Sequence, residues 1–242
     1  MFSFRIRLFD VCYGLNITQK LQQSNRKVMP LKYTHIIWDW NGTLLDDIGA
    51  SLASVNDMLS ARGKPPIDIN RYKECIGTPI IRFYEQVFEL ENEDYPLLLA
   101  EYNAGYMLHL SECGLTEGAV QAIETFASAG IHQAIISSSN NNQLCENAKK
   151  YGVYDRFEAV LGAADFKADS KIERALSYLA KSGAENSKVL VVGDLEHDAE
   201  MAAQIGADCV LLTSGHEHPT RLERSGAVIF DKISELVSFV KC

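Results

Sequence analysis

The sequence predicts an α/β fold in which a doubly wound parallel sheet carries an inserted all-helical cap. Short apolar runs alternate with helical patterns along most of the 242 residues. Such runs are typical of parallel strands that are buried on both faces. One long segment after the first run shows only helical periodicity, which predicts a separate helical unit.

Six apolar runs are candidate strands, because each has the length of a buried strand and is followed by turn residues or a helical pattern. They are residues 35–38 (HIIW), 133–136 (QAII), 157–161 (FEAVL), 188–192 (KVLVV), 208–212 (DCVLL) and 227–230 (AVIF).

The helical patterns between these runs have recognisable ends. Glycine is favoured just after a helix, and serine is favoured as the N-cap residue, here Ser170. The alternation therefore predicts a Rossmann-like sheet flanked by helices. The expected helices are residues 117–129 before Gly130, 170–182 before Gly183 and 197–205 before Gly206.

The segment between Asp46 and Leu115 contains no convincing strand, and its apolar residues recur at helical spacing. At about 70 residues it is too long for a single crossover connection. We therefore predict that residues 29–46 and 116–242 form the α/β core and that residues 47–115 form the cap. The apolar cap positions are Leu52, Val55, Met58, Leu59, Ile80, Tyr84, Val87, Phe88, Leu98, Tyr102 and Tyr106.

Residues 1–28 differ from the rest of the chain, because their only acidic residue is Asp10 among several arginines and lysines. A leader of this composition is typical of an organelle-targeting segment. The alternative, which we favour, is an extension ahead of a start at Met29. In either case we expect these residues to be a poorly ordered N-terminal extension.

The composition limits the classes of partner. The net charge of −9 argues against nucleic acid, since binding to a phosphate backbone needs a cationic surface. No apolar run approaches the roughly 20 residues of a membrane helix. The six cysteines are dispersed without a C-x-x-C pair, which indicates a reducing compartment and a cytoplasmic location. Both a monomer and a homodimer fit the sequence.

Polar residues follow the predicted strands at the edge where ligands bind in an open parallel sheet, beyond the carboxyl ends. Asp39 follows the first strand, and Ser137 follows the second. Asp194 and Asp198 follow the run at 188–192, and Lys171 lies near the start of the helix after 157–161. We expect these side chains to converge although they are far apart in the sequence.

This combination of residues suits phosphoryl transfer. Asp39 can attack phosphorus and form an aspartyl-phosphate. Mg²⁺ prefers oxygen ligands, so we expect Asp39 and Asp194 to bind it, with Asp198 binding directly or supporting the ligands. Lys171 can stabilise the charge of the transition state, although Lys167 is a competing candidate. A serine hydroxyl can hold the phosphate, and Ser137 and Ser138 are both candidates because the register is uncertain by one residue.

These motifs resemble the haloacid dehalogenase superfamily. The matching residues are Asp39-x-Asn41-Gly42-Thr43 after an apolar strand, then Ser137, Lys171 and Gly193-Asp194-x-x-x-Asp198, and the resemblance covers residues 33–240. It implies a phosphoglycolate-phosphatase-like fold with a C1-type helical cap, and Asp39 as the nucleophile. It also implies a Mg²⁺ site that uses Asp39, Asp194 and the backbone carbonyl of residue 41, and a small phosphomonoester metabolite as substrate.

One residue departs from the family pattern. Phosphatases of this superfamily usually have an aspartate two residues after the nucleophile, as the general acid/base, whereas this chain has Asn41. An amide cannot shuttle a proton near neutral pH, and such help is typically worth about 10²–10⁴-fold in rate. If the missing acid limits the rate, Asn41→Asp should raise the activity.

Asn41 leaves three interpretations open. The chain is a phosphatase of slow or selective action, which we favour, or a phosphate-binding regulatory protein with weak or no turnover. It is otherwise an enzyme of related chemistry, such as a phosphonatase, a phosphotransferase or a dehalogenase. The phosphonatase reading is weakened because Gly77 is not followed by the cap lysine that those enzymes use.

The remaining candidates are weaker. His216 and His218 have no third metal ligand nearby in the sequence, so we interpret them as loop residues. By the resemblance, the loop around Gly77 is the substrate-facing part of the cap. The basic residues of the cap could attract an anionic substrate, although most are expected to be solvated surface charges. They are Arg62, Lys64, Arg71, Lys73 and Arg82.

Overall fold

A computed structural model describes residues 31–77, 79–164 and 170–240 of the chain. The predictions made for residues 1–28 and for Met29 and Lys167 lie outside the described residues. No helix in the described part of the chain is long and apolar enough to cross a membrane.

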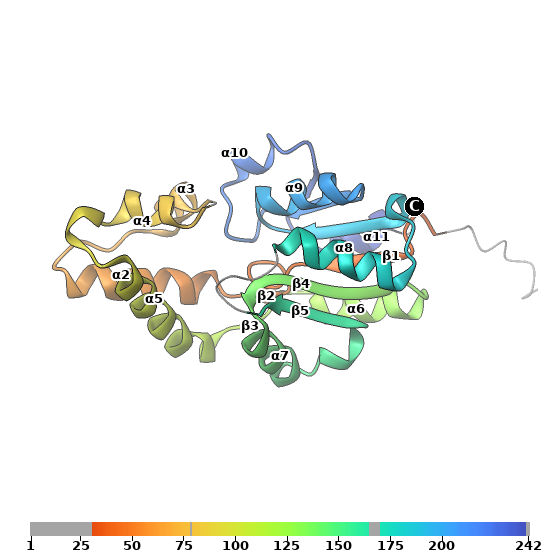
Figure 1. Ribbon diagram of the computed structural model, residues 1–242, viewed down its shortest axis with the longest axis horizontal. Helices are drawn as coiled ribbons and strands as arrows, with labels where there is room; N and C mark the ends of the chain where they lie inside the picture. The colour runs from red at the N-terminus through yellow and green to blue at the C-terminus, as the bar shows by residue number, and fades with distance from the viewer. Residues whose placement is uncertain (1–30, 78, 165–169, 241–242) are drawn as a thin grey trace, which may run out of the picture. The chain divides into compact units, whose positions relative to one another are not determined.

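The strands form a six-stranded parallel sheet, which confirms the predicted fold class (Figure 1). Its order is β5-β4-β1-β6-β7-β8. The strands are β1 (His35–Trp38), β4 (His132–Asn140), β5 (Ala159–Ala163), β6 (Val189–Gly193), β7 (Asp208–Leu212) and β8 (Val228–Phe230). A separate pair of two-residue strands, β2 (Leu45–Asp46) and β3 (Gly114–Leu115), runs antiparallel.

The strand order reverses direction beside β1. From β1 the chain first builds β4 and β5 on one side, and then β6, β7 and β8 on the other side. Ligands bind at such a switch point, outside the carboxyl ends of the strands. The two residues that follow β1 and β6 are Asp39 and Asp194, so both candidate carboxylates lie beside this point.

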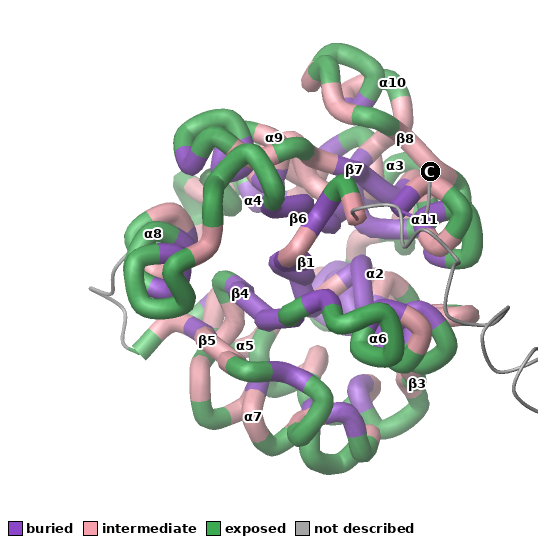
Figure 2. The backbone as a smooth tube through the Cα atoms, turned by 90° about the vertical axis from the view of Figure 1, so that its right-hand side faces the viewer, coloured by how far each residue is buried: buried purple, intermediate pink, exposed green. Residues whose placement is uncertain are grey.

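Helices cover both faces of the sheet (Figure 2). The helices α8 (Lys171–Ser182) and α9 (Glu196–Ile205) lie on one face, whereas α6 (Ala119–Ser128) and α11 (Ile233–Val240) lie on the other. The helix α7 (Asn141–Lys150) packs on β4 and β5. The remaining short elements of the core are α10 (Pro219–Leu222), η3 (Tyr154–Arg156) and η4 (Asn186–Lys188).

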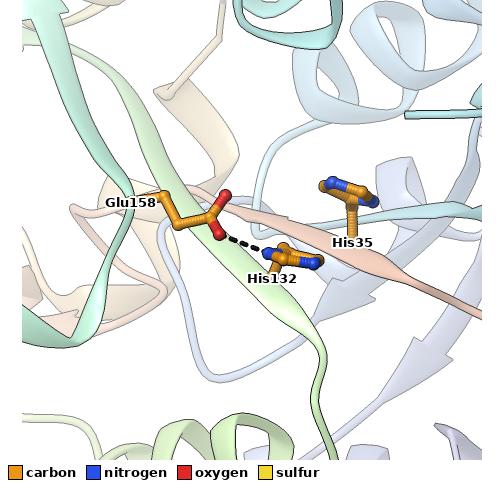
Figure 3. A group of neighbouring side chains, drawn as sticks. All are labelled: His35, His132 and Glu158. Atoms are coloured by element: carbon orange, nitrogen blue, oxygen red, sulfur yellow. Dashed lines mark hydrogen bonds and ion pairs between the residues drawn. The ribbon is translucent and has the colours of Figure 1, made fainter. Parts of the chain in front are cut away.

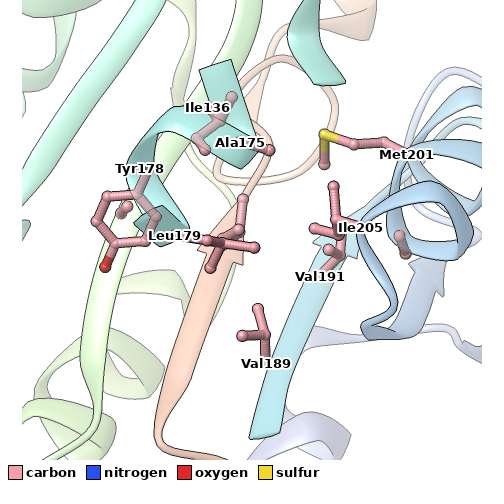
Figure 4. Close-up of a cluster of buried hydrophobic side chains, with 11 residues drawn as sticks. Ile136, Ala175, Tyr178, Leu179, Val189, Val191, Met201 and Ile205 are labelled. Atoms are coloured by element: carbon pink, nitrogen blue, oxygen red, sulfur yellow. The ribbon is translucent and has the colours of Figure 1, made fainter. Parts of the chain in front are cut away.

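The core between the sheet and helices α8 and α9 is apolar and closely packed (Figure 4). β-Branched strand residues meet Leu179 and Met201 of the helices, and all of them are buried. Burying one such side chain stabilises the fold by about 1.5–3 kcal/mol. This packing fixes the strands, and the strands in turn fix the residues at both of their ends. The cluster contains Ile37, Ala134, Ile136, Ala175, Tyr178, Leu179, Val189, Val191, Met201, Ala202 and Ile205.

The insert between β2 and β3 is helical, as expected, and lies beyond the carboxyl ends of the strands (Figure 1). Asp68 and Asp94 cap two of its helices, since their side chains accept from backbone N–H groups of the first turn. The elements are α2 (Ile48–Ala61), α3 (Ile69–Cys75), α4 (Ile81–Val87), η1 (Leu90–Asn92), α5 (Tyr95–His109) and η2 (Leu110–Glu112).

Three details of the sequence prediction were wrong. The strand β4 continues to Asn140, because its backbone still pairs with β5 after the apolar residues end at Ile136. The ribbon β2–β3 was missed, since strands of two residues carry no periodicity. Ile80 was assigned to an apolar helix face but is 44% exposed, because α4 begins only at Ile81.

Candidate active site

The candidate nucleophile, Asp39, lies directly after β1 at the carboxyl edge of the sheet. Its backbone N–H donates to the carbonyl of Val192 in β6 at 2.8 Å, which anchors it to the neighbouring strand. The side chain is buried. The first residue of the site is therefore positioned by two central strands of the sheet.

Lys171 lies against this carboxylate. It is the first residue of α8, whose start is fixed by a capping box between Ser170 and Glu173. Its Nζ atom is 2.5 Å from Asp39 Oδ1 and 2.5 Å from Asp198 Oδ1, and all three side chains are buried. The structure thus holds the Lys171 ammonium between two buried carboxylates.

Asp198 supports the turn that follows β6. Its second oxygen, Oδ2, accepts from the backbone N–H groups of Asp194 at 3.1 Å and Leu195 at 3.0 Å. Gly193 makes this possible, because a Cβ atom there would lie 2.2 Å from Asp198 Oδ2. Both oxygens of Asp198 are therefore engaged, one with the turn and one with Lys171.

Asp194 is fully buried, and each of its oxygens has a partner. Oδ1 accepts from the Thr43 hydroxyl at 3.0 Å, and Oδ2 accepts from the backbone N–H of His216 at 2.7 Å. Gly42 and Gly215 allow this close approach, because a Cβ atom on either would lie within 2.2 Å of an Asp194 atom. Gly42 also has φ 69°, a left-handed conformation that favours glycine.

These buried charges perturb one another. Burial raises the pKa of Asp39 to about 6, although the Lys171 ammonium opposes this. Burial, with the nearby Asp39 and Asp198 carboxylates, raises the pKa of Asp194 to about 8. Burial lowers the pKa of Lys171, but the Asp198 and Asp39 carboxylates outweigh burial and raise it above the usual value. The single ammonium of Lys171 therefore does not balance the negative charge of the three carboxylates around it.

A divalent cation fits this surplus of negative charge. One carboxylate oxygen from each of Asp39, Asp194 and Asp198 lies within 4.8 Å of the others. With Lys171, three carboxylates and one ammonium leave two negative charges in excess when all are ionised. Burying unpaired charge is costly, and oxygen donors of this kind suit Mg²⁺.

Asn41 is held by three side chains rather than facing open space. Its amide nitrogen donates to Asp47 Oδ2 at 2.7 Å and to the Tyr106 hydroxyl at 2.9 Å. Its amide oxygen accepts from the Ser139 hydroxyl. The amide thus joins the loop after β1 to strand β4 and to helix α5 of the cap.

Asp47 and His216 form the centre of this network, and both are buried. His216 Nε2 is 3.1 Å from Asp47 Oδ1, and its Nδ1 is 2.9 Å from the hydroxyl of Tyr72 in α3. Burial lowers the pKa of His216, but the Asp47 carboxylate outweighs burial and raises it to about 9. His216 is in a loop, as expected, but it is a buried link between core and cap rather than a solvated residue.

Sequence reasoning missed Asp47 and Ser139, named Thr43 only as part of the motif, and interpreted His216 as a loop residue. His216 follows β7 at the carboxyl edge, so the rule that selected Asp39 and Asp194 could have selected it too. Ser139 was one of three adjacent serines. No pattern marks Asp47, because it lies at the start of the cap and is identified only by its partners.

The two predicted serines are placed differently. Ser137 is buried, and its hydroxyl oxygen accepts from the backbone N–H of Ser139 at 3.2 Å. It lies two residues after Ile135, which pairs with Trp38 at the end of β1. Ser138 is exposed. Successive side chains of a strand point to opposite faces, so Ser137 and Ser138 of β4 face opposite ways. The buried residue, Ser137, is therefore the better candidate for binding phosphate.

Three of the five cap cations, Arg62, Lys64 and Arg71, pair with acidic residues of the cap. Arg62 bonds to Glu93 and Glu101. Lys73 is different, because its Nζ donates to the carbonyl of Thr213, in the loop after β7, at 3.1 Å.

The other cap cations add nothing to the site. Lys64 pairs with Glu89, and Arg71 pairs with Glu74. Arg82 is exposed. Near the Gly77 loop, the Arg221 guanidinium of the core donates to the carbonyl of Ile76. Of these five cap cations, Lys73 is the one that contacts a core loop at the carboxyl edge of the sheet.

Comparison with known proteins gives a consistent result. The family profile of haloacid dehalogenase-like hydrolases matches residues 36–212. The phosphoglycolate phosphatase of Thiobacillus denitrificans is 24% identical over 198 residues, which are 78% of this chain and 87% of the relative. Phosphoglycolate phosphatase 1 of Pseudomonas aeruginosa is 23% identical over 213 residues, or 84% of this chain and 78% of the relative.

The fold also matches solved structures. The structure of a hydrolase, a haloacid dehalogenase-like family protein from Streptococcus pneumoniae, aligns with a TM-score of 0.73 and 18% identity. The alignment covers 86% of this chain and 98% of that chain. At this identity the likeness supports the fold alone.

Proposed function

Because this chain belongs to the haloacid dehalogenase-like hydrolase family, we propose that it is a phosphatase that forms an aspartyl-phosphate on Asp39. The substrate is a small phosphomonoester. The observation that carries the proposal is the buried cluster of Asp39, Asp194 and Asp198 around Lys171 at the switch point of the sheet. Similarity to phosphoglycolate phosphatases supports the substrate class.

In the first step a carboxylate oxygen of Asp39 forms a bond to phosphorus, and the bond from phosphorus to the leaving oxygen breaks. In the second step water attacks the same phosphorus, which releases inorganic phosphate and restores the carboxylate. With a pKa of about 6, Asp39 is mostly ionised at neutral pH, as a nucleophile must be. The Lys171 ammonium holds Asp39 in place and can stabilise charge on the phosphoryl oxygens.

Mg²⁺ would be held by Asp39, Asp194 and the backbone carbonyl of Asn41, with Asp198 fixing the turn that carries Asp194. When bound, Mg²⁺ supplies positive charge that lets an anionic carboxylate approach an anionic phosphate. Ser137 would donate a hydrogen bond to the phosphate. Lys73, which reaches the loop after β7, would attract the substrate from the cap side.

Asn41 has a positioning role in this proposal. Its three hydrogen bonds tie the nucleophile loop to β4 and to the cap. Since an amide cannot supply a proton, the leaving oxygen must take its proton from another group or from water. Substrates whose leaving group needs little protonation should therefore react faster than alkyl phosphates.

A two-part experiment tests the proposal. Hydrolysis of p-nitrophenyl phosphate and of an alkyl phosphate is measured with and without Mg²⁺. Enzyme quenched in acid during turnover is then digested, and mass spectrometry identifies the phosphorylated peptide. We expect Mg²⁺-dependent hydrolysis that is faster for the aryl ester, and phosphate on Asp39.

The alternative function is phosphate binding without turnover, which Asn41 motivates. It predicts that inorganic phosphate binds with Mg²⁺ while neither ester is hydrolysed and no residue becomes phosphorylated. That result would overturn the phosphatase proposal. Phosphate on a different residue would overturn the role of Asp39 alone.

A further inference from the structure

A second polar cluster lies at the opposite, amino end of the same sheet (Figure 3). His35 is the first residue of β1, His132 is the first residue of β4, and Glu158 directly precedes β5. These three strands are adjacent in the sheet. Among the described residues, this cluster and the three active-site carboxylates are the two groups that could hold a metal ion.

The sheet itself sets the geometry of the cluster. His35 pairs with His132 in the parallel register, so the two imidazoles project side by side. Their rings stack with centroids 4.8 Å apart and planes inclined by 22°. His132 Nδ1 and Glu158 Oε1 are in direct contact. One donor atom of each residue lies within 4.8 Å of the donor atoms of the other two.

We propose that His35, His132 and Glu158 form a binding site for Zn²⁺ or a similar late transition-metal cation. Two imidazole nitrogens and one carboxylate oxygen are a donor set that Zn²⁺ accepts, with a fourth position left for water. Imidazole nitrogen suits zinc, copper and nickel, whereas Mg²⁺ takes oxygen ligands. The two edges of the sheet are therefore built for cations of different chemistry.

Two outer hydrogen bonds support this assignment. The Thr34 hydroxyl oxygen is 2.9 Å from His35 Nδ1. The Tyr178 hydroxyl in α8 donates to Glu158 Oε2 at 3.3 Å, which leaves Oε1 directed at His132. Metal ligands in proteins commonly have such partners, which orient the ring and the carboxylate.

Access also fits a bound ion. The side chains of His132 and Glu158 are 52% and 46% exposed, so an ion and its water can reach them. His35 is only 7% exposed and is held between its neighbours. A cation bound between His132 and Glu158 would take the place of the proton that their hydrogen bond shares. It would also link the start of β1 to the starts of β4 and β5.

The test is a calorimetric titration of the full chain with zinc chloride in excess Mg²⁺, which occupies the active-site carboxylates. We expect one zinc site in the wild type and a loss of affinity of at least about tenfold in His132→Ala and in Glu158→Gln. Both residues are half-exposed, and circular dichroism checks that each variant is folded. Phosphatase activity should be unchanged in both.

His109→Ala is the matched control. His109 is also paired with a carboxylate, since its Nε2 lies 2.7 Å from Asp57 Oδ2, but it belongs to neither group of potential metal ligands among the described residues. Its removal should leave zinc affinity at the wild-type value. Zinc affinity unchanged in His132→Ala, or absent from the wild type, would overturn the proposal.

Discussion

The two ends of the sheet carry polar clusters of opposite character. At the carboxyl edge, Asp39, Asp194 and Asp198 surround Lys171, and all four side chains are buried. At the amino edge two imidazoles meet one carboxylate, and two of these three side chains are about half exposed. The cations proposed for the two edges differ accordingly, because oxygen donors suit Mg²⁺ whereas imidazole nitrogen suits a late transition metal.

The histidines at the two edges show the same contrast. His216, at the carboxyl edge, is buried, which lowers its pKa, but the Asp47 carboxylate raises it to about 9. His35, at the amino edge, is also buried, and burial together with the neighbouring His132 lowers its pKa. Burial therefore lowers the pKa of both imidazoles, and only at His216 does a carboxylate partner outweigh it.

The largest expected effect is that of Asp39→Asn. The amide cannot attack phosphorus, so hydrolysis of p-nitrophenyl phosphate should fall by at least about 10³-fold. Zinc affinity at the amino edge should not change, since the two clusters are at opposite ends of the strands. Asp46→Asn is the control, because Asp46 is an exposed carboxylate in the nearby strand β2. Activity retained by Asp39→Asn would refute the mechanism.

Asp194→Asn should separate metal binding from stability. We expect Mg²⁺ affinity, measured through the Mg²⁺ dependence of the rate, to fall by about 100-fold. In the absence of Mg²⁺ the variant should melt a few degrees higher than the wild type. The pKa of this acid is raised to about 8 in the folded state, so its ionisation destabilises the fold as pH rises from 4 towards 8. A lower melting temperature would contradict this account of the carboxyl edge.

The pH dependence of stability should report His216. Its pKa is raised on folding, so the stabilisation is fully present below pH 6.5 and is lost as pH rises through about 9. In urea denaturation, the free energy of unfolding of the wild type relative to His216→Gln should therefore fall by about 3 kcal/mol across this range. His218→Gln is the control and should retain the wild-type pH dependence. If the free energy of unfolding of His216→Gln changed with pH as much as that of the wild type, the ion pair between His216 and Asp47 would not be the cause of the pH dependence.

The smallest expected effect is that of Asn41→Asp, and the structure reverses its sign from the sequence-based expectation. The new carboxylate would face Asp47 Oδ2, where the amide nitrogen now donates at 2.7 Å. Two adjacent carboxylates cannot both ionise at low cost, so activity should fall by about tenfold, or 1.4 kcal/mol.

The double variant Asn41→Asp with Asp47→Asn provides the matched comparison for this change. In this variant the amide is at position 47 and the carboxylate is at position 41, so the amide can again donate to the carboxylate. The double variant should therefore be more active than Asn41→Asp alone. If the single variant instead exceeds the wild type, a carboxylate at position 41 acts as the acid despite Asp47.

Much of the fold followed from the sequence. The apolar runs located the six strands of the parallel sheet to within a few residues. Glycines marked the ends of α8 and α9, where Gly183 and Gly206 adopt left-handed conformations. The rule that ligands bind beyond the carboxyl ends of the strands correctly predicts that Asp39, Lys171, Asp194 and Asp198 lie close together. These features are predictable because they depend on local sequence. Buried strands appear as apolar runs, and helix ends are marked by glycine.

Only the tertiary structure decided which polar residues became partners. Asn41 meets Ser139 across the sheet, His216 meets Asp47 from a distant loop, and Glu158 meets His132 through the register of neighbouring strands. Each contact depends on distances of a few ångströms between side chains that no sequence spacing relates. The sequence alone determined where chemistry could take place, because strand ends are encoded locally. The packed fold determined which polar groups are in contact, because those contacts depend on separation in space.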